Sequence, residues 1–158
     1  MFSKRFLFLQ VFLFLVLGSL LFTVYRQKMS VPALPVLGQV SHFSLDNSDG
    51  LKTSLEDLKG KVWVADFVFT TCGSICPMMT KHMNVLHRSF HDNDDVRLLS
   101  ISVNPENDSP EVLNQFARKY KADTKHWFFL TGSREEITKI VVESFKLGDI
   151  KDPIFHSS

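Results

Sequence analysis

The sequence predicts an α/β domain with a parallel sheet, preceded by one N-terminal membrane-spanning helix. An uncharged apolar run opens the chain, and apolar strand patterns then alternate with amphipathic helix patterns. Once the membrane segment is subtracted, about 120 of the 158 residues remain, which suits a single domain. A formal net charge of +1 gives no reason to expect nucleic acid as a partner.

The apolar run Phe6–Tyr25 carries no charge and is long enough to cross a bilayer. A cleaved signal peptide is the alternative, but the run is longer than a usual signal core and no A-x-A-like site follows it. We therefore expect a membrane anchor in residues 1–28, a linker in residues 29–40 and a folded domain in residues 41–158. The absence of an organellar transit sequence favours a bacterial plasma (inner) membrane, crossed once, with the domain facing the periplasm or exterior.

The remaining elements follow from hydrophobic periodicity and capping residues. Residues 42–60 are expected to form a hairpin and a helical turn. Val62–Phe69 is almost continuously apolar, which is typical of a central strand covered on both faces. Next we predict a helix over Pro77–His91, with an apolar stripe at Met79, Met83, Leu86 and Phe90. Two further strands are expected at Val96–Val103 and Trp127–Leu130. Each is followed by a helix: the first is capped by Ser109, and the second begins with a Ser133 capping box and ends at Gly148.

Cys72 and Cys76 lie four positions apart, between the buried strand and the N-terminus of the first helix. Free N–H groups and the helix dipole stabilise a thiolate there, the form that binds metal or attacks disulfides. An inert structural disulfide is the alternative, but it would close a very short loop and stabilise little. The C-x-x-x-C spacing leaves room for an ion, and soft sulfur with imidazole suits Cu(I) or Zn(II). Spacing alone selects no partner among the six histidines.

Several segments, in the same order, resemble the Sco/SenC family over about residues 41–158. They are the run from Gly60 to Pro77 with its C-x-x-x-C-P, the run from Ser100 to Pro110, Trp127–Gly132, and Phe155-His156-Ser157. The resemblance implies a thioredoxin-like fold. It also implies that Cys72, Cys76 and His156 are ligands of one copper ion, as Cu(I) or Cu(II).

Proteins of this family deliver copper to the dinuclear copper site of cytochrome c oxidase, or keep the cysteines of that site reduced. The resemblance thus implies a monomeric assembly factor or metallochaperone rather than a turnover enzyme. Its expected partners are the copper-site subunit of the oxidase and other copper or thiol-redox proteins.

Two features depart from the family pattern. Asn104 stands where the family usually has an aspartate, although Asp108 keeps the second carboxylate of that motif. The chain ends two residues after His156, where a family member continues with a hairpin and a helix, so we expect a partial sequence with an incomplete fold. In such a fragment the strand Val62–Phe69 would become an open edge, with poor solubility as the expected result.

Asp66 supports an alternative function. A carboxylate in an apolar strand is costly unless it is neutral, paired or functional, and this one precedes Cys72 by six positions, like the buried aspartate of thioredoxin. It favours a thiol–disulfide oxidoreductase that uses Cys72 and Cys76 without metal. A carboxylate reaching a lysine or water is the structural alternative. A peroxiredoxin-like peroxidase is the third class, weakened because no arginine lies near Cys72 in sequence.

Other residues have simpler interpretations. Histidines 87 and 91 are expected on a solvated helix face, 82 and 126 at the surface, and 42 in a strand. Met79 and Met83 are expected in the core, while Met78 lies near the sulfurs and could support the site.

Overall fold

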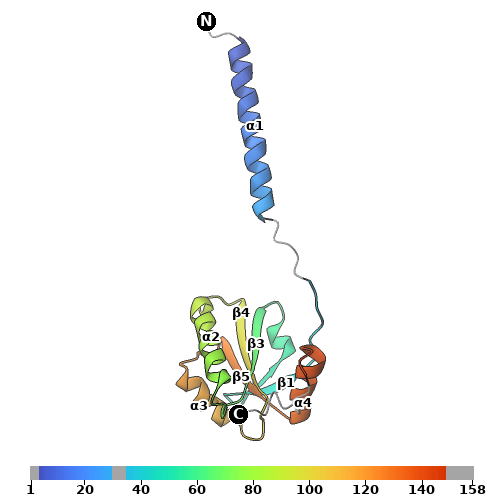
Figure 1. Ribbon diagram of the computed structural model, residues 1–158, viewed down its shortest axis with the longest axis vertical. Helices are drawn as coiled ribbons and strands as arrows, with labels where there is room; N and C mark the ends of the chain where they lie inside the picture. Colours follow the sequence, from blue (N-terminus) through green and yellow to red (C-terminus); the bar gives the residue numbers. More distant parts are fainter. Residues whose placement is uncertain (1–3, 30–34, 149–158) are drawn as a thin grey trace. The chain divides into compact units, whose positions relative to one another are not determined.

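The first 37 residues and the part from Gly38 onward form two separate compact units. The computed structural model describes residues 4–29 and 35–148 (Figure 1). The first unit contains α1, Lys4–Met29. Within α1, the 18 residues Phe8–Tyr25 form a segment that is long and apolar enough to cross a membrane. No other helix among the described residues meets this condition. The expected spanning helix is therefore present by length and composition.

The second unit is built on a five-stranded mixed sheet with the order β2-β1-β5-β4-β3. The strands are β1 (Ser44–Asn47), β2 (Lys52–Ser54), β3 (Val62–Val68), β4 (Val96–Ser102) and β5 (Trp127–Thr131). β3, β4 and β5 run parallel, whereas β1 is antiparallel to both β2 and β5. The predicted parallel sheet and the predicted N-terminal hairpin are both confirmed.

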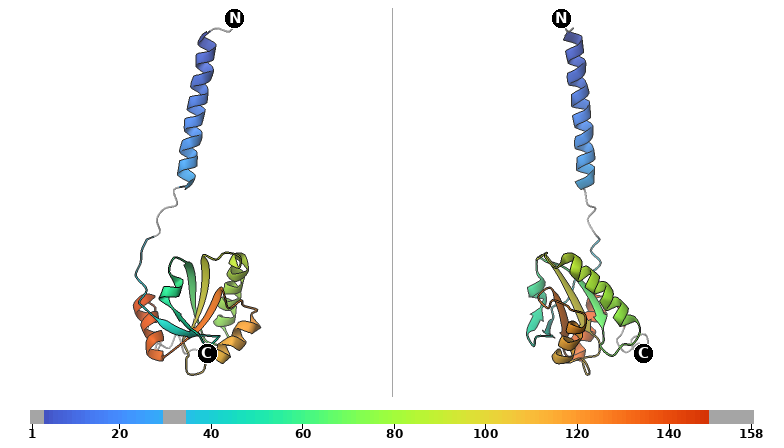
Figure 2. Two further views of the ribbon diagram at one scale, coloured as in Figure 1. Left: turned by 180° about the vertical axis from the view of Figure 1, so that it is seen from behind. Right: turned by 90° about the vertical axis from the view of Figure 1, so that its left-hand side faces the viewer.

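Helices cover the two faces of this sheet. The helical segments are η1 (Leu55–Leu58), α2 (Ile75–Phe90), α3 (Pro110–Lys119), α4 (Arg134–Lys139) and the π-helical turn η2 (Ile140–Ser144). α2 and α3 lie on one face, and α4 with η2 lies on the other (Figures 1 and 2). The connections β3-α2-β4 and β4-α3-β5 each return the chain to a parallel neighbour.

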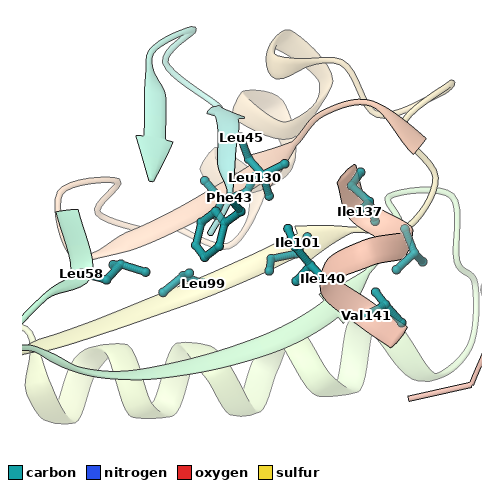
Figure 3. Packing of buried hydrophobic residues seen from close by; sticks show 10 residues of the cluster. Phe43, Leu45, Leu58, Leu99, Ile101, Leu130, Ile137, Ile140 and Val141 are labelled. Carbon is teal, nitrogen blue, oxygen red and sulfur yellow. The ribbon is translucent and has the colours of Figure 1, made fainter. Parts of the chain in front are cut away.

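The core between the sheet and η2 joins residues that are far apart in sequence (Figure 3). Leu99 and Ile101 of β4 pack with Phe43 and Leu45 from the N-terminal hairpin and with Ile140 of η2. Each of these side chains is at most 4% exposed, and burial of one such side chain is worth about 1.5–3 kcal/mol. The backbone N–H of Ser41 also donates to Ser144 Oγ at 2.9 Å, which ties the start of the domain to η2.

The opposite core, beneath α2 and α3, is aromatic. Trp127 and Phe129 of β5 are fully buried, with ring centroids 4.9 Å apart. Leu113 and Phe116 of α3 and Met83 of α2 complete this cluster. The same face of the sheet carries the polar residues that lead to the cysteines.

The position of β3 differs from the expectation of a central strand covered on both faces and agrees with the expectation that Val62–Phe69 forms an open edge. Within the described part of the chain β3 pairs with β4 alone and forms the edge of the sheet. Val62 is 68% exposed and Val64 is 40% exposed, whereas Val68 at the other end is fully buried. A continuous apolar run identified the strand correctly, but only its cysteine-proximal end is buried.

The capping predictions are confirmed at two helices. Ser109 Oγ accepts a hydrogen bond from Val112 N and Pro110 opens α3, while Ser133 and Glu136 form the predicted capping box of α4. The prediction that Gly148 closes the last helix is wrong. The helix ends four residues before Gly148, and Lys146 takes the left-handed conformation with φ 56°.

The buried face of α2 is also displaced from the predicted stripe. Its buried residues are Cys76, Thr80, Met83 and His87. Phe90 is 44% exposed, and His87, expected on a solvated face, is buried with its ring 5.7 Å from that of Trp127. The predicted stripe failed because it assumed that apolar residues alone face the sheet.

Candidate functional site

The turn between β3 and α2 carries both cysteines. Cys72 lies in this turn, and Cys76 is the second residue of α2, which begins at Ile75 rather than at the predicted Pro77. Pro77 thus occupies the third helical position, where the missing N–H would have had no partner within the helix. The early start places the Cys76 thiol within the first turn of the helix.

The two thiols are free and close enough to share a hydrogen bond. The backbone N–H of Cys76 donates to Cys72 Sγ at 3.4 Å, and Ser74 Oγ lies 3.8 Å from the same sulfur. Cys72 is 8% exposed and Cys76 4% exposed. An incoming group can therefore reach Cys72 more easily than Cys76.

The surroundings separate the acidities of the two thiols. At Cys72, burial opposes ionisation, but hydrogen bonds from the Cys76 thiol and from the N–H groups of Cys76 and Ser74 outweigh it and lower the pKa to about 7. At Cys76, burial and the neighbouring Cys72 sulfur raise the pKa to about 11, with a smaller contribution from the charge of Asp66. This pattern gives one ready nucleophile or metal ligand and one thiol that keeps its proton.

Asp108 is hydrogen-bonded to the segment that leads into the cysteine turn. Its carboxylate is fully buried and accepts hydrogen bonds from the Thr70 N–H at 3.1 Å, the Thr70 hydroxyl at 2.5 Å and the Ser102 hydroxyl at 2.6 Å. Asp108 lies just before α3, so one side chain links that helix, β4 and the turn that carries Cys72. No such role was predicted for this residue.

Asp66 ends a second polar chain on the same face. Trp127 Nε1 donates to Ser100 Oγ at 2.9 Å, and the Ser100 hydroxyl donates to Asp66 Oδ1 at 2.6 Å. Asp66 Oδ2 has no hydrogen-bond partner among the described residues. Burial raises the pKa of Asp66 to about 6, although the Ser100 hydrogen bond opposes this effect. Among the described residues Asp66 is hydrogen-bonded to Ser100 and pairs with no lysine, so the lysine half of the structural alternative is not seen there.

The third predicted ligand, His156, lies outside the described residues. In residues 4–29 and 35–148 no group of three or more His, Cys, Asp or Glu side chains could hold a metal. His82 is exposed as predicted, and Met78, two residues after Cys76, is 53% exposed. Two of three predicted ligands are therefore brought together in the described part of the chain.

Ser100, Ser102 and Asp108 are functional candidates that sequence reasoning missed. A signal was available, because two serines at alternate positions of an otherwise apolar strand place two hydroxyls on one face. That face points at Asp66 and Asp108, the two buried carboxylates next to the thiol turn.

A strand–turn–helix unit with two free thiols and a nearby buried carboxylate, on this sheet, defines a thioredoxin-like thiol protein. The SCO1/SenC family model matches residues 37–153, and the chain belongs to this family. The resemblance found in the sequence is thereby confirmed.

The relatives include a SCO1 protein homolog of Bacillus subtilis, 45% identical over 130 residues, which cover 78% of this chain and 67% of the relative. Among solved structures, BsSco, described as having a disulfide switch and as a member of the Sco family of cytochrome c oxidase assembly proteins, is 45% identical. Its TM-score is 0.68, and the match covers 79% of this chain and 74% of BsSco. ScoI of Bradyrhizobium japonicum with copper bound is 28% identical, has a TM-score of 0.60, and is matched over 66% of this chain and 65% of its own.

Proposed function

We propose that this protein binds one copper ion through Cys72, Cys76 and His156 and acts in the assembly of cytochrome c oxidase. In one form of this function copper is the cargo and is delivered to the dinuclear copper site of the oxidase. In the other form the substrates are the cysteines of that oxidase site, which the protein keeps reduced. The single observation that carries the proposal is the pair of free thiols on one turn, hydrogen-bonded through the Cys76 N–H and differing in pKa.

The donor chemistry supports copper. Two sulfurs are the soft ligands that Cu(I) prefers, and an imidazole completes a set that also accepts Cu(II). Among the described residues the two sulfurs belong to no group of three or more His, Cys, Asp or Glu side chains that could hold a metal. The proposed third donor is an imidazole. His156 is our candidate because it occupies the family's His-Ser position.

The same proposal includes the cellular location. The apolar part of α1 supports a single-pass anchor in a bacterial plasma (inner) membrane, with a monomeric domain facing the periplasm or exterior. From there the domain would reach the copper-site subunit of the oxidase.

The test is copper titration of the reduced 158-residue chain in detergent, with X-ray absorption on the loaded protein. We expect one copper bound by two sulfurs and one imidazole, and loss of tight binding in His156→Ala. His82→Ala is the matched control, because His82 is an exposed histidine on α2. Copper affinity that is unchanged in His156→Ala would overturn the ligand assignment.

A thiol–disulfide oxidoreductase that uses no metal is the second candidate function. The hydrogen bonds that lead from Trp127 through Ser100 to the buried carboxylate of Asp66 favour it. In this reaction the Cys72 thiolate attacks a partner's disulfide and releases one partner thiol. Cys76, after losing its proton, attacks the mixed disulfide, which leaves a Cys72–Cys76 disulfide and a reduced partner. Asp66 in its ionised form is the candidate acceptor for the Cys76 proton, through water. This function predicts that His156→Ala keeps disulfide exchange, while Asp66→Asn slows exchange and keeps copper binding.

A further inference from the structure

A groove of about 1040 Å³ runs along α2, between that helix and the segment that follows α3. Along α2 its lining extends from Pro77, the residue next to Cys76, to His91. Across from α2 it is lined by residues 119–121 and by Asp123. A molecule seated in the groove would therefore lie beside the thiol turn.

The groove is strongly basic although the whole chain carries a net charge of only +1. Four cationic side chains line it: Lys81, Arg88, Lys119 and Lys121. All four are exposed, and within the part of the chain that the structure describes none forms an ion pair. Asp123, the one acidic residue in the lining, is already hydrogen-bonded to His126 at 3.0 Å.

The spacing of the cations favours an extended ligand over a single small anion. Lys81 and Arg88 are seven residues apart on α2, which is about 10 Å along a helix. Lys119 and Lys121 add positive charge on the opposite wall. Positive charge distributed along two walls complements several carboxylates on one chain, and such complementarity accelerates encounter.

We propose that this groove docks an acidic segment of the protein that exchanges copper or thiols at Cys72 and Cys76. The inference rests on the proposed function, because it assumes a partner that approaches the thiols. Docking along α2 would bring the partner's sulfur or metal site to the turn beside Pro77.

The test measures the rate at which Cys72 forms a mixed disulfide with two probe peptides. Each short peptide has one cysteine activated as a 2-thiopyridyl disulfide, flanked by glutamates in one peptide and by glutamines in the other. The Cys72 thiolate attacks the peptide sulfur, and the released 2-thiopyridone is followed by absorbance. The 158-residue chain is used, metal-free and reduced, in a neutral detergent.

We expect the glutamate peptide to react about tenfold faster than the glutamine peptide at low salt, as for electrostatic steering. This preference should fall towards one in about 0.5 M sodium chloride because the charges are screened. It should also be lost in the double variant Lys81→Glu, Lys121→Glu. The matched control is Lys139→Glu with Lys146→Glu, which changes the net charge equally beyond the opposite face of the sheet and should keep the preference.

Three results would overturn the proposal: no preference in the unmodified chain, a preference that survives the groove variant, or an equal loss in both double variants. Abolition of the preference by inorganic phosphate, but not by sodium chloride of equal ionic strength, would instead identify a small-anion site and also overturn it. The glutamine peptide reports folding and thiol reactivity separately in each variant. Failure of the groove is thus distinguishable from failure of the proposed function, which copper titration tests.

Discussion

The buried carboxylate of Asp108 accepts hydrogen bonds from both the backbone N–H and the hydroxyl of Thr70, two residues before Cys72. Its remaining contact is the Ser102 hydroxyl at 2.6 Å. The family motif that contains this aspartate lies far from the cysteines in sequence. In the structure it is the anchor of the turn that presents them.

Asp108→Ala should lower the free energy of unfolding by about 2–4 kcal/mol, because it leaves the Thr70 and Ser102 donors without a buried acceptor. Urea unfolding of the 158-residue chain in detergent, followed by tryptophan fluorescence, measures this change, since Trp63 and Trp127 both lie in the domain. Asn107→Ala is the control, because Asn107 is exposed beside Asp108. Equal stability of the two variants would show that Asp108 does not anchor the turn.

Cys72 should be alkylated well before Cys76 in the reduced, metal-free protein. The pKa of Cys72 is about 7 and that of Cys76 about 11, so the rate of carbamidomethylation by iodoacetamide should rise with pH around a midpoint near 7 and label Cys72 first. Peptide mass spectrometry identifies the labelled cysteine.

Cys76→Ser should leave Cys72 reactive but less so than in the unmodified protein, because the thiol of Cys76 is lost as a donor while the backbone N–H groups of residues 74 and 76 remain. In Cys72→Ser the remaining thiol should still label slowly at neutral pH, because burial is the largest cause that raises the pKa of Cys76. Rapid labelling of Cys76 in Cys72→Ser at pH 7 would show that burial does not raise its pKa. The comparison needs no copper, so it is independent of the ligand assignment.

Local signals predicted much of this fold. Ser109 with Pro110 and the Ser133 capping box identified two helix starts within one residue, because a cap is a contact between sequence neighbours. The thiol pair was likewise predictable, since its members lie only four positions apart. Two other features of the site depend on partners that are distant in sequence.

His87 and Asp108 show this dependence. A histidine among polar neighbours indicates solvent, yet Trp127, forty positions later, covers His87. The role of Asp108 depends on the meeting of β4, α3 and the thiol turn, which no local pattern encodes. His156, named by the family resemblance, lies outside the described residues, so its role stays a prediction.

The Asp66→Asn variant should become progressively more stable relative to the unmodified protein as the pH rises from about 4 to about 7. The pKa of Asp66 is raised from 3.8 to about 6 in the folded state, so the neutral side chain is favoured there. That contribution is complete below the unfolded pKa and is lost as the pH rises through 6, because the folded carboxylate is then ionised while buried. A pKa difference of about two units between the folded and unfolded states corresponds to at most about 3 kcal/mol of unfolding free energy.

The measurement for Asp66 is the difference in unfolding free energy between Asp66→Asn and the unmodified chain at several pH values. Taking the difference removes the titration of every other group that the substitution leaves unchanged. A difference that does not change between pH 4 and pH 7 would show that Asp66 titrates normally.

Lys146→Gly should raise the free energy of unfolding by about 0.5–1 kcal/mol. Lys146 has φ 56°, a left-handed conformation that costs a side-chain-bearing residue energy and glycine none. The residues around it end η2, with the Leu147 N–H donating to the Val141 carbonyl at 3.1 Å, so the conformation is required there. Gly148→Ala is the control and should change little, because Gly148 is exposed. If Gly148→Ala were the more damaging change and Lys146→Gly brought no gain in urea unfolding, the helix would end at Gly148, as the sequence alone had suggested.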